Sequence, residues 1–559
     1  MRRRGILAGV IAACAIVLAA CAGMPTSGPV TVGLGSGDVD DDVDLSFLAT
    51  GPQKGAGPEQ IVQGFLAAGT SPQDNWAVAK EFLAPPLRET WNPNAGVTID
   101  LLASREIAVT SDEAVSATVR PVADVDETGV YAEVDAGTVT LPFRLAQQAD
   151  GEWRITEAED GIVLDRDFFP QIYRSYSLMF FDPSWTFLVP DVRWFPARTN
   201  TASRIVTELI EGGPSPWLRG AVVSAFPEDI SAPSSVTNDN GVAQVEVPVA
   251  ALGLSRTQLD RMQAQLEESL ATASFTGAVM TVGTVDIQAS PAPTRSTRVE
   301  PRPAVLTKDG FGFLVGEELQ PIAGISEGMR KLAPVGIELG PDRDVAAVRV
   351  EGGAVVRLRS NQESTPVDER TGLIDPTVDA DGFIWSVPAA RPGALIAFAP
   401  DGTAHPVAGG WGDASRITSM ELSRDGTRIV ALVEVGGRHE AWVAGVQRDG
   451  DERIPVRLGE PLRLAVLPGT EEDVAWLDGE TVGIVSSIDT DDIVYTQQVG
   501  GTRTSSNAPG DITTIVGGNQ LTGARLAAAD GTMYVRTGTR WQSSATGILI
   551  LATQQGSPR

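Results

Sequence analysis

The sequence predicts a multidomain protein in which two α+β domains are followed by an all-β propeller. Three observations support this. An apolar stretch preceded by arginines opens the chain, apolar residues recur at helical spacing only before about residue 290, and Asp-Gly turns recur between β-rich segments after it. A chain of 559 residues is long enough to bury several separate cores.

Residues 1–20 have the composition of a signal peptide. Three arginines, Arg2 to Arg4, precede an apolar run from Ile6 to Ala20. The run is shorter than the about 20 residues that comfortably span a bilayer, so we expect it to be cleaved. Its last residues and Cys21 read Leu-Ala-Ala-Cys and match the bacterial lipobox. This resemblance implies cleavage between Ala20 and Cys21, lipid on Cys21, and an anchor on the outer face of the cell membrane.

Charge and cysteine content exclude several classes of protein. The formal net charge is −29 and no basic stripe interrupts it, so we expect no nucleic-acid partner. The chain has two cysteines, Cys14 inside the signal peptide and Cys21 at its end. The mature chain therefore keeps one cysteine and can form no internal disulfide.

Residues 21–53 are predicted to form a flexible acidic tether, because Gly, Ser, Thr and Asp dominate and few residues could be buried. The spacing of Asp38, Asp40 and Asp42 is typical of the start of a calcium loop. Val43 and Ala49, however, stand where such a loop needs glycine and glutamate. We therefore expect no metal there.

Residues 54–170 are predicted to form an α+β domain. Pro58 suits a first helical turn, and Ile61, Val62, Phe65 and Leu66 share one face of that helix. A second helix carries Trp76, Ala79, Phe82 and Leu83, and Pro85-Pro86 is expected to end it. Valine-rich strands follow, and their antiparallel sheet is expected to curve. This order of elements is similar to that of the NTF2-like cone.

Residues 171–297 are predicted to form a second α+β domain. A hairpin turns at Asp182-Pro183, and a helix with Thr201 as its cap ends at Gly212-Gly213-Pro214. An alternating strand around Val245 precedes another helix, for which Ser255 or Thr257 is the cap. The runs Phe180–Asp182, Leu188–Pro190, Leu209–Ser215 and Ala225–Pro227 resemble the GerMN domain, with Gly212 as a departure. The resemblance implies a binding module.

Residues 298–559 are predicted to form a β-propeller. Asp-Gly pairs occur at Asp309, Asp381, Asp425, Asp478 and Asp530, and the wide first interval leaves room for another unit near Gly352-Gly353. These intervals are typical of four-stranded blades, so we expect about six of them. The phrase from Leu422 to Val430 resembles the blade hairpin of many bacterial propellers.

Catalytic and metal sites are not predicted. The only histidines, His405 and His439, are expected to be ordinary strand or loop residues, and zinc-type motifs are absent from the sequence. Gly324-Ile325-Ser326-Glu327-Gly328 matches a nucleophile elbow, but it follows Pro321 in a β-rich region, where we expect an exposed loop. We therefore expect no catalytic residue and no cofactor. Trp185, Trp194 and Trp217 could mark a binding face, although core positions are the stronger expectation.

The order of lipobox, cone-like domain, GerMN-like domain and propeller resembles the LpqB family of actinobacterial lipoproteins over nearly the whole chain. The resemblance implies a non-enzymatic accessory of the MtrA–MtrB two-component system, which binds the extracellular domain of the sensor histidine kinase and affects envelope homeostasis and division. An alternative is a protein that binds or hydrolyses cell-wall glycan, and a plain scaffold is a third possibility.

Overall fold

The computed structural model describes residues 49–134, 137–197, 200–489 and 491–556. All of them belong to one compact unit, residues 47–559. Within this part of the chain, no helix combines the length and apolar character needed to cross a membrane.

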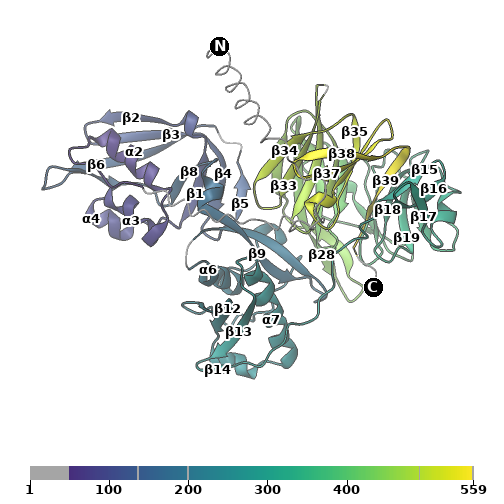
Figure 1. The fold of residues 1–559 in the computed structure, drawn as a ribbon, viewed down its shortest axis with the longest axis horizontal. Coiled ribbons are helices and arrows are strands. Elements are labelled where there is room, and N and C mark those ends of the chain that lie inside the picture. Colours follow the sequence, from purple (N-terminus) through teal and green to yellow (C-terminus); the bar gives the residue numbers. More distant parts are fainter. Residues whose placement is uncertain (1–48, 135–136, 198–199, 490, 557–559) are drawn as a thin grey trace, which may run out of the picture. The chain divides into compact units, whose positions relative to one another are not determined.

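The first domain places three helices against two four-stranded sheets (Figure 1). The helices are α2 (Pro58–Ala68), α3 (Gln73–Glu81) and α4 (Pro85–Thr90). The strands are β1 (Gly96–Asp100), β2 (Glu106–Ser111), β3 (Ala114–Val119), β4 (Pro121–Asp126), β5 (Tyr131–Glu133), β6 (Val139–Gln147), β7 (Trp153–Glu157) and β8 (Ile162–Asp165). One sheet has the order β5-β4-β1-β8 and the other β2-β3-β6-β7. The expected α+β class is confirmed.

Two local expectations for this domain need correction. The first sheet is not wholly antiparallel, because β1 pairs with β8 in parallel. Pro85 and Pro86 do not end the second helix; they form the first turn of α4. The reason is that N–H groups in a first helical turn have no partner within the helix, so proline loses nothing there.

The second domain is built on a long hairpin and a smaller mixed sheet. Its elements are α5 (Phe169–Ile172), β9 (Tyr173–Phe181), β10 (Leu188–Pro196), α6 (Thr201–Thr207), β11 (Thr237–Asp239), β12 (Val242–Glu246), α7 (Arg256–Ala271), β13 (Gly277–Val282) and β14 (Val285–Asp286). Strands β9 and β10 pair antiparallel, and β12 pairs in parallel with β13. Helix α7 packs against β9 and β13.

The helix caps of this domain agree only in part with expectation. Ser255 caps α7, since its hydroxyl accepts a hydrogen bond of 3.2 Å from the backbone N–H of Gln258. Thr201 is the first residue of α6 and does not cap it; its hydroxyl donates to the carbonyl of Pro196 instead. Gly213, with φ of +67°, ends this helical segment as expected.

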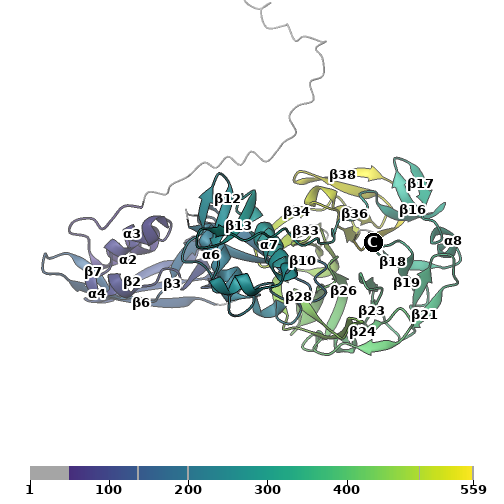
Figure 2. The same ribbon diagram turned by 90° about the horizontal axis from the view of Figure 1, so that it is seen from below.

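The third domain contains, within the described residues, six blades arranged in a ring (Figure 2). Five of them have four strands, and blade 3 has a fifth, β30 (Leu462–Leu467), which pairs antiparallel with its third strand. We number the blades by chain order of their first strands. They are blade 1 (β18 Pro334–Leu339, β19 Val345–Val350, β20 Val355–Arg359, β21 Thr365–Asp368), blade 2 (β22 Thr377–Val378, β23 Ile384–Ser386, β24 Ile396–Phe398, β25 Ala404–Pro406), blade 3 (β26 Arg416–Leu422, β27 Arg428–Val435, β28 Arg438–Asp449, β29 Ile454–Leu458), blade 4 (β31 Thr470–Trp476, β32 Thr481–Ile488, β33 Asp491–Gln498, β34 Arg503–Asn507), blade 5 (β35 Ile512–Val516, β36 Arg525–Ala528, β37 Met533–Thr537, β38 Arg540–Ala545) and blade 6 (β39 Ile548–Gln554, β15 Ala304–Thr307, β16 Gly310–Val315, β17 Glu318–Pro321).

Blade 6 closes the ring with both ends of the domain. Its first strand, β39, comes from the end of the chain, and it pairs antiparallel with β15, which opens the domain. Residues 338–339 of β18 also pair with β39, in parallel. Joining the first and last strands in one sheet leaves the ring without an open seam.

The Asp-Gly turns lie in blade hairpins, but not at one equivalent place. Those at Asp381, Asp425 and Asp478 join the first and second strands of blades 2, 3 and 4. Those at Asp309 and Asp530 join the second and third strands of their blades. In blade 1 the hairpin between the second and third strands contains Gly352-Gly353. This blade lies in the wide interval between Asp309 and Asp381, where the sequence left room for another unit.

The three domains share buried contacts. One apolar cluster combines Leu178 and Leu218 of the second domain with Val443 and Trp476 of the propeller. Another joins Trp194 of β10 to the core of the first domain. The fit is close at Gly445, where an added Cβ atom would lie 2.8 Å from the carbonyl oxygen of Trp217. The hairpin β9–β10 thus packs into both neighbouring domains.

Candidate functional site

The predicted lipidation site, Cys21, and its cleavage neighbour Ala20 lie outside the described residues, as do Asp38, Asp40 and Asp42. The remaining candidates lie in the described part of the chain. His405 lies on β25 and His439 on β28, as expected for ordinary strand residues. Trp194 and Trp217 are buried, while Trp185 is half-buried with the Arg261 guanidinium 4.0 Å above its ring.

Ser326 corrects one expectation. The segment around it is not an exposed loop, because Ser326 is buried at the start of the short helix α8 (Ser326–Met329). Its hydroxyl donates to the carbonyl of Phe311 at 2.6 Å and accepts from the backbone N–H of Ile322 at 2.7 Å. Both capacities of the hydroxyl are therefore used to hold the blade together. Among the residues described, no cluster of His, Cys, Asp or Glu has the arrangement of a metal site.

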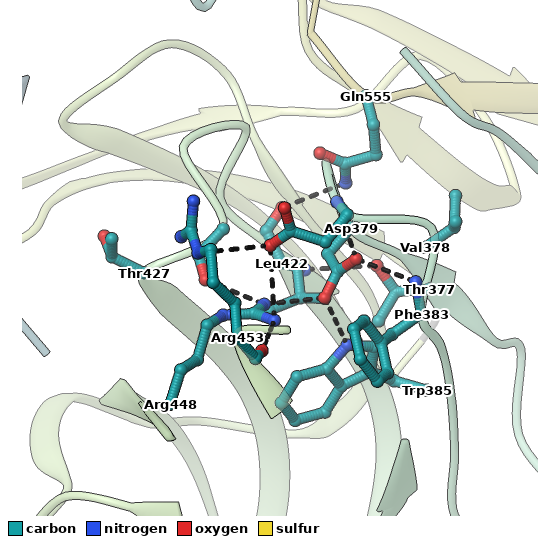
Figure 3. Close-up of polar contacts among 12 residues, drawn as sticks. Thr377, Val378, Asp379, Phe383, Trp385, Leu422, Thr427, Arg448, Arg453 and Gln555 are labelled. Carbon is teal, nitrogen blue, oxygen red and sulfur yellow. Dashed lines mark hydrogen bonds and ion pairs between the residues drawn. The ribbon is translucent and has the colours of Figure 1, made fainter. Parts of the chain in front are cut away.

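A network of buried polar groups surrounds the propeller axis. Glu338, on β18, accepts three hydrogen bonds at one carboxylate oxygen, from the Thr377 hydroxyl at 2.8 Å, the Val378 N–H at 3.0 Å and the Gln555 amide at 2.8 Å. Figure 3 labels these three donor residues and also Leu422, whose carbonyl accepts a hydrogen bond of 3.0 Å from the Gln555 amide. The donors come from blade 2 and from the end of the chain, so Glu338 joins blades 1, 2 and 6.

Two other carboxylates also accept hydrogen bonds from the neighbouring blade. Glu421 of β26 accepts from the backbone N–H of Trp476 on β31, at 3.0 Å. Asp473 of β31 accepts from the backbone N–H of Ile515 on β35, at 2.9 Å. In each case a carboxylate on a first strand holds the first strand of the next blade. These groups fasten blades 3 to 4 and 4 to 5.

Burial sets the protonation of these carboxylates. Loss of hydration raises the pKa of Glu338 to about 7 and that of Asp473 to about 7, although the hydrogen bonds described above oppose the rise. The pKa of Glu421 is also raised, by burial first and then by the nearby charge of Glu338. The axis therefore carries carboxyl groups that are neutral under mildly acidic conditions.

A second network of buried polar groups runs from the propeller axis to the contact between the propeller and the second domain. Asp379 is buried and accepts from the N–H of Phe383 at 2.9 Å, the indole of Trp385 at 3.1 Å and the guanidinium of Arg448 at 2.6 Å. In Figure 3, Asp379 lies between the two arginines Arg448 and Arg453 and the two rings. This network joins the hairpins of blades 2 and 3.

Arg453 continues the network into the second domain. Its guanidinium lies 3.2 Å from the carboxylate of Asp182 and donates to the Ser184 hydroxyl at 2.7 Å. Asp182 is fully buried and also accepts the N–H of Thr186 at 2.7 Å. The predicted Asp182-Pro183 turn is thus one of the points where the hairpin β9–β10 is attached to the propeller.

The Gly-Gly-Pro-Ser segment of the second domain is attached in a similar way. Asp191 accepts from the hydroxyl of Ser215 at 2.6 Å and from Arg193 at 2.8 Å. Arg193 also donates to the carbonyl of Gly213 at 2.9 Å and to that of Thr128 at 3.0 Å. Since Thr128 belongs to the first domain, this motif holds a domain boundary and has a structural role.

The first domain also contains a cavity of about 240 Å³, lined by residues of α2, of β1, β4 and β8 in one sheet, and of β6 in the other. Sequence reasoning missed it, because its lining residues are scattered from Phe65 to Val163 and their apolar character indicates only a core. A weak sequence pattern could have indicated the axial carboxylates. Ile337-Glu338-Leu339 and Met420-Glu421-Leu422 place glutamate at the same point of two apolar strands.

Three domain-family models match the chain. "Lipoprotein LpqB, N-terminal domain" matches residues 51–170, "Sporulation and spore germination" matches residues 177–289, and "Lipoprotein LpqB beta-propeller domain" matches residues 309–549.

Curated relatives with the name Lipoprotein LpqB are similar over different lengths. The protein of Streptomyces avermitilis is 26% identical over 97% of both chains. That of Bifidobacterium longum is 26% identical over 80% of this chain and 79% of its own. That of Thermobifida fusca is 32% identical over 47% of this chain and 44% of its own.

Solved structures give weaker matches. A chain of a nidogen/laminin complex has a TM-score of 0.32 at 10% identity, covering 45% of this chain and 96% of that one. TolB from Acinetobacter baumannii has a TM-score of 0.28 at 11% identity, covering 75% and 80%. At these TM-scores the likeness carries no inference.

Proposed function

Because the chain belongs to the LpqB lipoprotein family, we propose that it is a lipid-anchored protein on the outer face of the cell membrane that binds and modulates a sensor kinase of the MtrA–MtrB type. Through that kinase it affects envelope homeostasis and division. The protein acts by binding and not by catalysis.

The sequence supports the anchor. Cys21 follows Ala19-Ala20 at the end of an apolar run, and lipid there would hold the protein at the membrane. Two or three acyl chains on one cysteine anchor stably, because each buried methylene contributes about 0.8 kcal/mol. The 32 residues between Cys21 and Lys54 span at most about 120 Å when extended, which gives the folded domains room to reach a neighbouring receptor.

The observation that carries the binding proposal is the shared packing of the three domains. The hairpin β9–β10 contributes buried residues to the cores of both neighbours. A body held in this way presents broad surfaces at fixed distances, and binding loses little conformational entropy. Confinement at the membrane can raise avidity by about 10² to 10⁴ without new contacts, so a weak docking surface suffices.

Two chemical features support binding rather than catalysis. The Ser326 hydroxyl, in the elbow-like sequence, is committed to two hydrogen bonds inside a blade. The axial carboxylates are likewise engaged by neighbouring strands. These side chains do structural tasks in the described part of the chain.

The test is kinase autophosphorylation in vesicles that carry the full sensor kinase. Wild-type lipoprotein should change the rate, and Cys21→Ala should lose most of that effect because it loses confinement. Cys14→Ala is the matched control, since it removes the other cysteine of the chain and leaves the lipobox intact. Identical rates with wild type, Cys21→Ala and no lipoprotein would refute the regulatory proposal. Turnover of peptidoglycan fragments by the full chain would instead favour the hydrolase alternative.

A further inference from the structure

The cavity in the first domain has a chemically uneven lining. Its volume is about 240 Å³. An apolar cavity of about 150 Å³ binds benzene, so this one has room for a small aromatic molecule with a short side chain. Glu159 and Asp160 at its border are exposed, so the cavity is reachable from solvent.

Aromatic and aliphatic side chains form most of the wall. The Phe65 ring packs edge to face against Trp91, with centroids 5.3 Å apart, and against Phe143 at 6.0 Å. Leu141 and Val125 complete the apolar surface. The Trp91 indole donates to the Glu159 carbonyl at 3.1 Å, which fixes the ring at the edge of the cavity. A preformed apolar wall of this kind binds an apolar body with little rearrangement.

The charged groups of the lining all have one sign. Asp124, Glu159 and Asp160 line the cavity, and none of the described lining residues is lysine or arginine. Asp160 is already engaged by the backbone N–H of Asn92 at 2.8 Å. Asp124 lies opposite Thr98 in the β1–β4 pairing. Burial raises the pKa of Asp124, although a hydrogen bond with Thr98 opposes this, so its charge lacks full compensation there.

We propose that this cavity binds a small molecule with an aromatic or apolar body and one cationic amine, the body against Phe65 and Trp91 and the ammonium group paired with Asp124. Anions are disfavoured, because every charged lining residue is acidic. The site goes beyond the proposed function and does not depend on the kinase.

The test uses three probes that share a phenylethyl body and differ in the charge of the end group: 2-phenylethylamine, 2-phenylethanol and 3-phenylpropionate. Binding to the purified full chain at pH 7 is measured by calorimetry and by saturation-transfer NMR. The amine should bind about tenfold or more tightly than the carboxylate, since hydrogen bonds between charged groups are worth that factor or more. Asp124→Asn should weaken the amine about tenfold and leave 2-phenylethanol within about twofold of wild type.

Two further variants complete the design. Leu141→Trp fills the cavity and should abolish binding of both the amine and the alcohol. Glu106→Gln removes an equal charge from an exposed position on β2 and should change nothing. Equal affinity for the amine and the carboxylate, no effect of Asp124→Asn, or no binding of any probe would each overturn the proposal. If Leu141→Trp lowers the melting temperature markedly, the probe series and Asp124→Asn still decide.

Discussion

Replacing Glu338 by glutamine should make the propeller more stable at pH 8 and leave its stability nearly unchanged at pH 5. The pKa of Glu338 is about 7 in the folded protein and about 4.5 when the chain is unfolded. Between these values the folded state binds more protons, so the free energy of unfolding falls as pH rises through this window. Above pH 7 the ionised Glu338 lowers the free energy of unfolding by roughly 3 kcal/mol at most.

The side-chain geometry makes glutamine a suitable substitute. All three donors to Glu338 converge on one oxygen, so the amide oxygen of glutamine can accept them all. Its NH₂ group then takes the place of the protonated oxygen. Removing the charge also relieves Glu421, whose pKa the charge of Glu338 helps to raise. Both effects act in the same direction.

Thermal unfolding of the full chain at pH 5, 6, 7 and 8 measures the effect, with tryptophan fluorescence as the signal. The Glu338→Gln variant should gain several degrees in melting temperature over wild type at pH 8, since about 1 kcal/mol corresponds to 2–4 °C in a domain of this size. Glu318→Gln, at an exposed position on β17, is the control. A difference between Glu338→Gln and wild type that does not grow with pH, or that favours wild type at pH 8, would refute the reasoning.

Three other predictions follow from the buried contacts. Asp379→Ala should lower the free energy of unfolding in urea by about 3–5 kcal/mol, because it leaves the buried Arg448 without its main counter-ion. Asp491→Ala, at an exposed position on β33, is the control and should lower it little. Equal losses in the two variants would contradict the role of Asp379. Trp194→Phe should cost about 1–3 kcal/mol by removing the 2.9 Å bond to the Gly500 carbonyl, more than Trp541→Phe, whose bond to Ser506 is partly exposed. Chelator and reductant should leave the melting temperature unchanged, and a drop of many degrees with chelator would reveal a metal site.

The sequence predicted local structure better than the pairing of distant segments. Apolar periodicity located α2 and α7, and Asp-Gly turns located five propeller hairpins, because each depends on residues close in sequence. The pairing of β39 with β15 joins residues about 250 positions apart, and a short apolar strand has no sequence pattern that identifies the strand it pairs with. The turns at Asp309 and Asp530 occupy the second hairpins of their blades, so turn spacing alone does not give the blade boundaries.

Buried charges were the hardest features to foresee. A carboxylate within an apolar strand, such as Glu338, usually indicates a strand edge or an exposed face. Only the closed ring brings the N–H groups of the next blade to it. Arg453 likewise lies in a hairpin with no distinguishing motif, and its role depends on Asp182, far away in the sequence. Such pairs are set by tertiary contacts, which residue patterns do not encode locally.

The position of these networks bears on how the three domains act together. Asp182 meets Arg453, Asp191 holds both Ser215 and Arg193, and Arg193 reaches Thr128 in the first domain. All of these residues except Arg453 and Thr128 belong to the second domain, so that domain connects its neighbours through buried charge. Removing one partner of a buried ion pair lowers the free energy of unfolding by several kcal/mol. Such pairs therefore oppose relative movement of the domains, which a flexible linker would allow. The second domain therefore ties the propeller to the first domain through buried polar contacts as well as apolar packing.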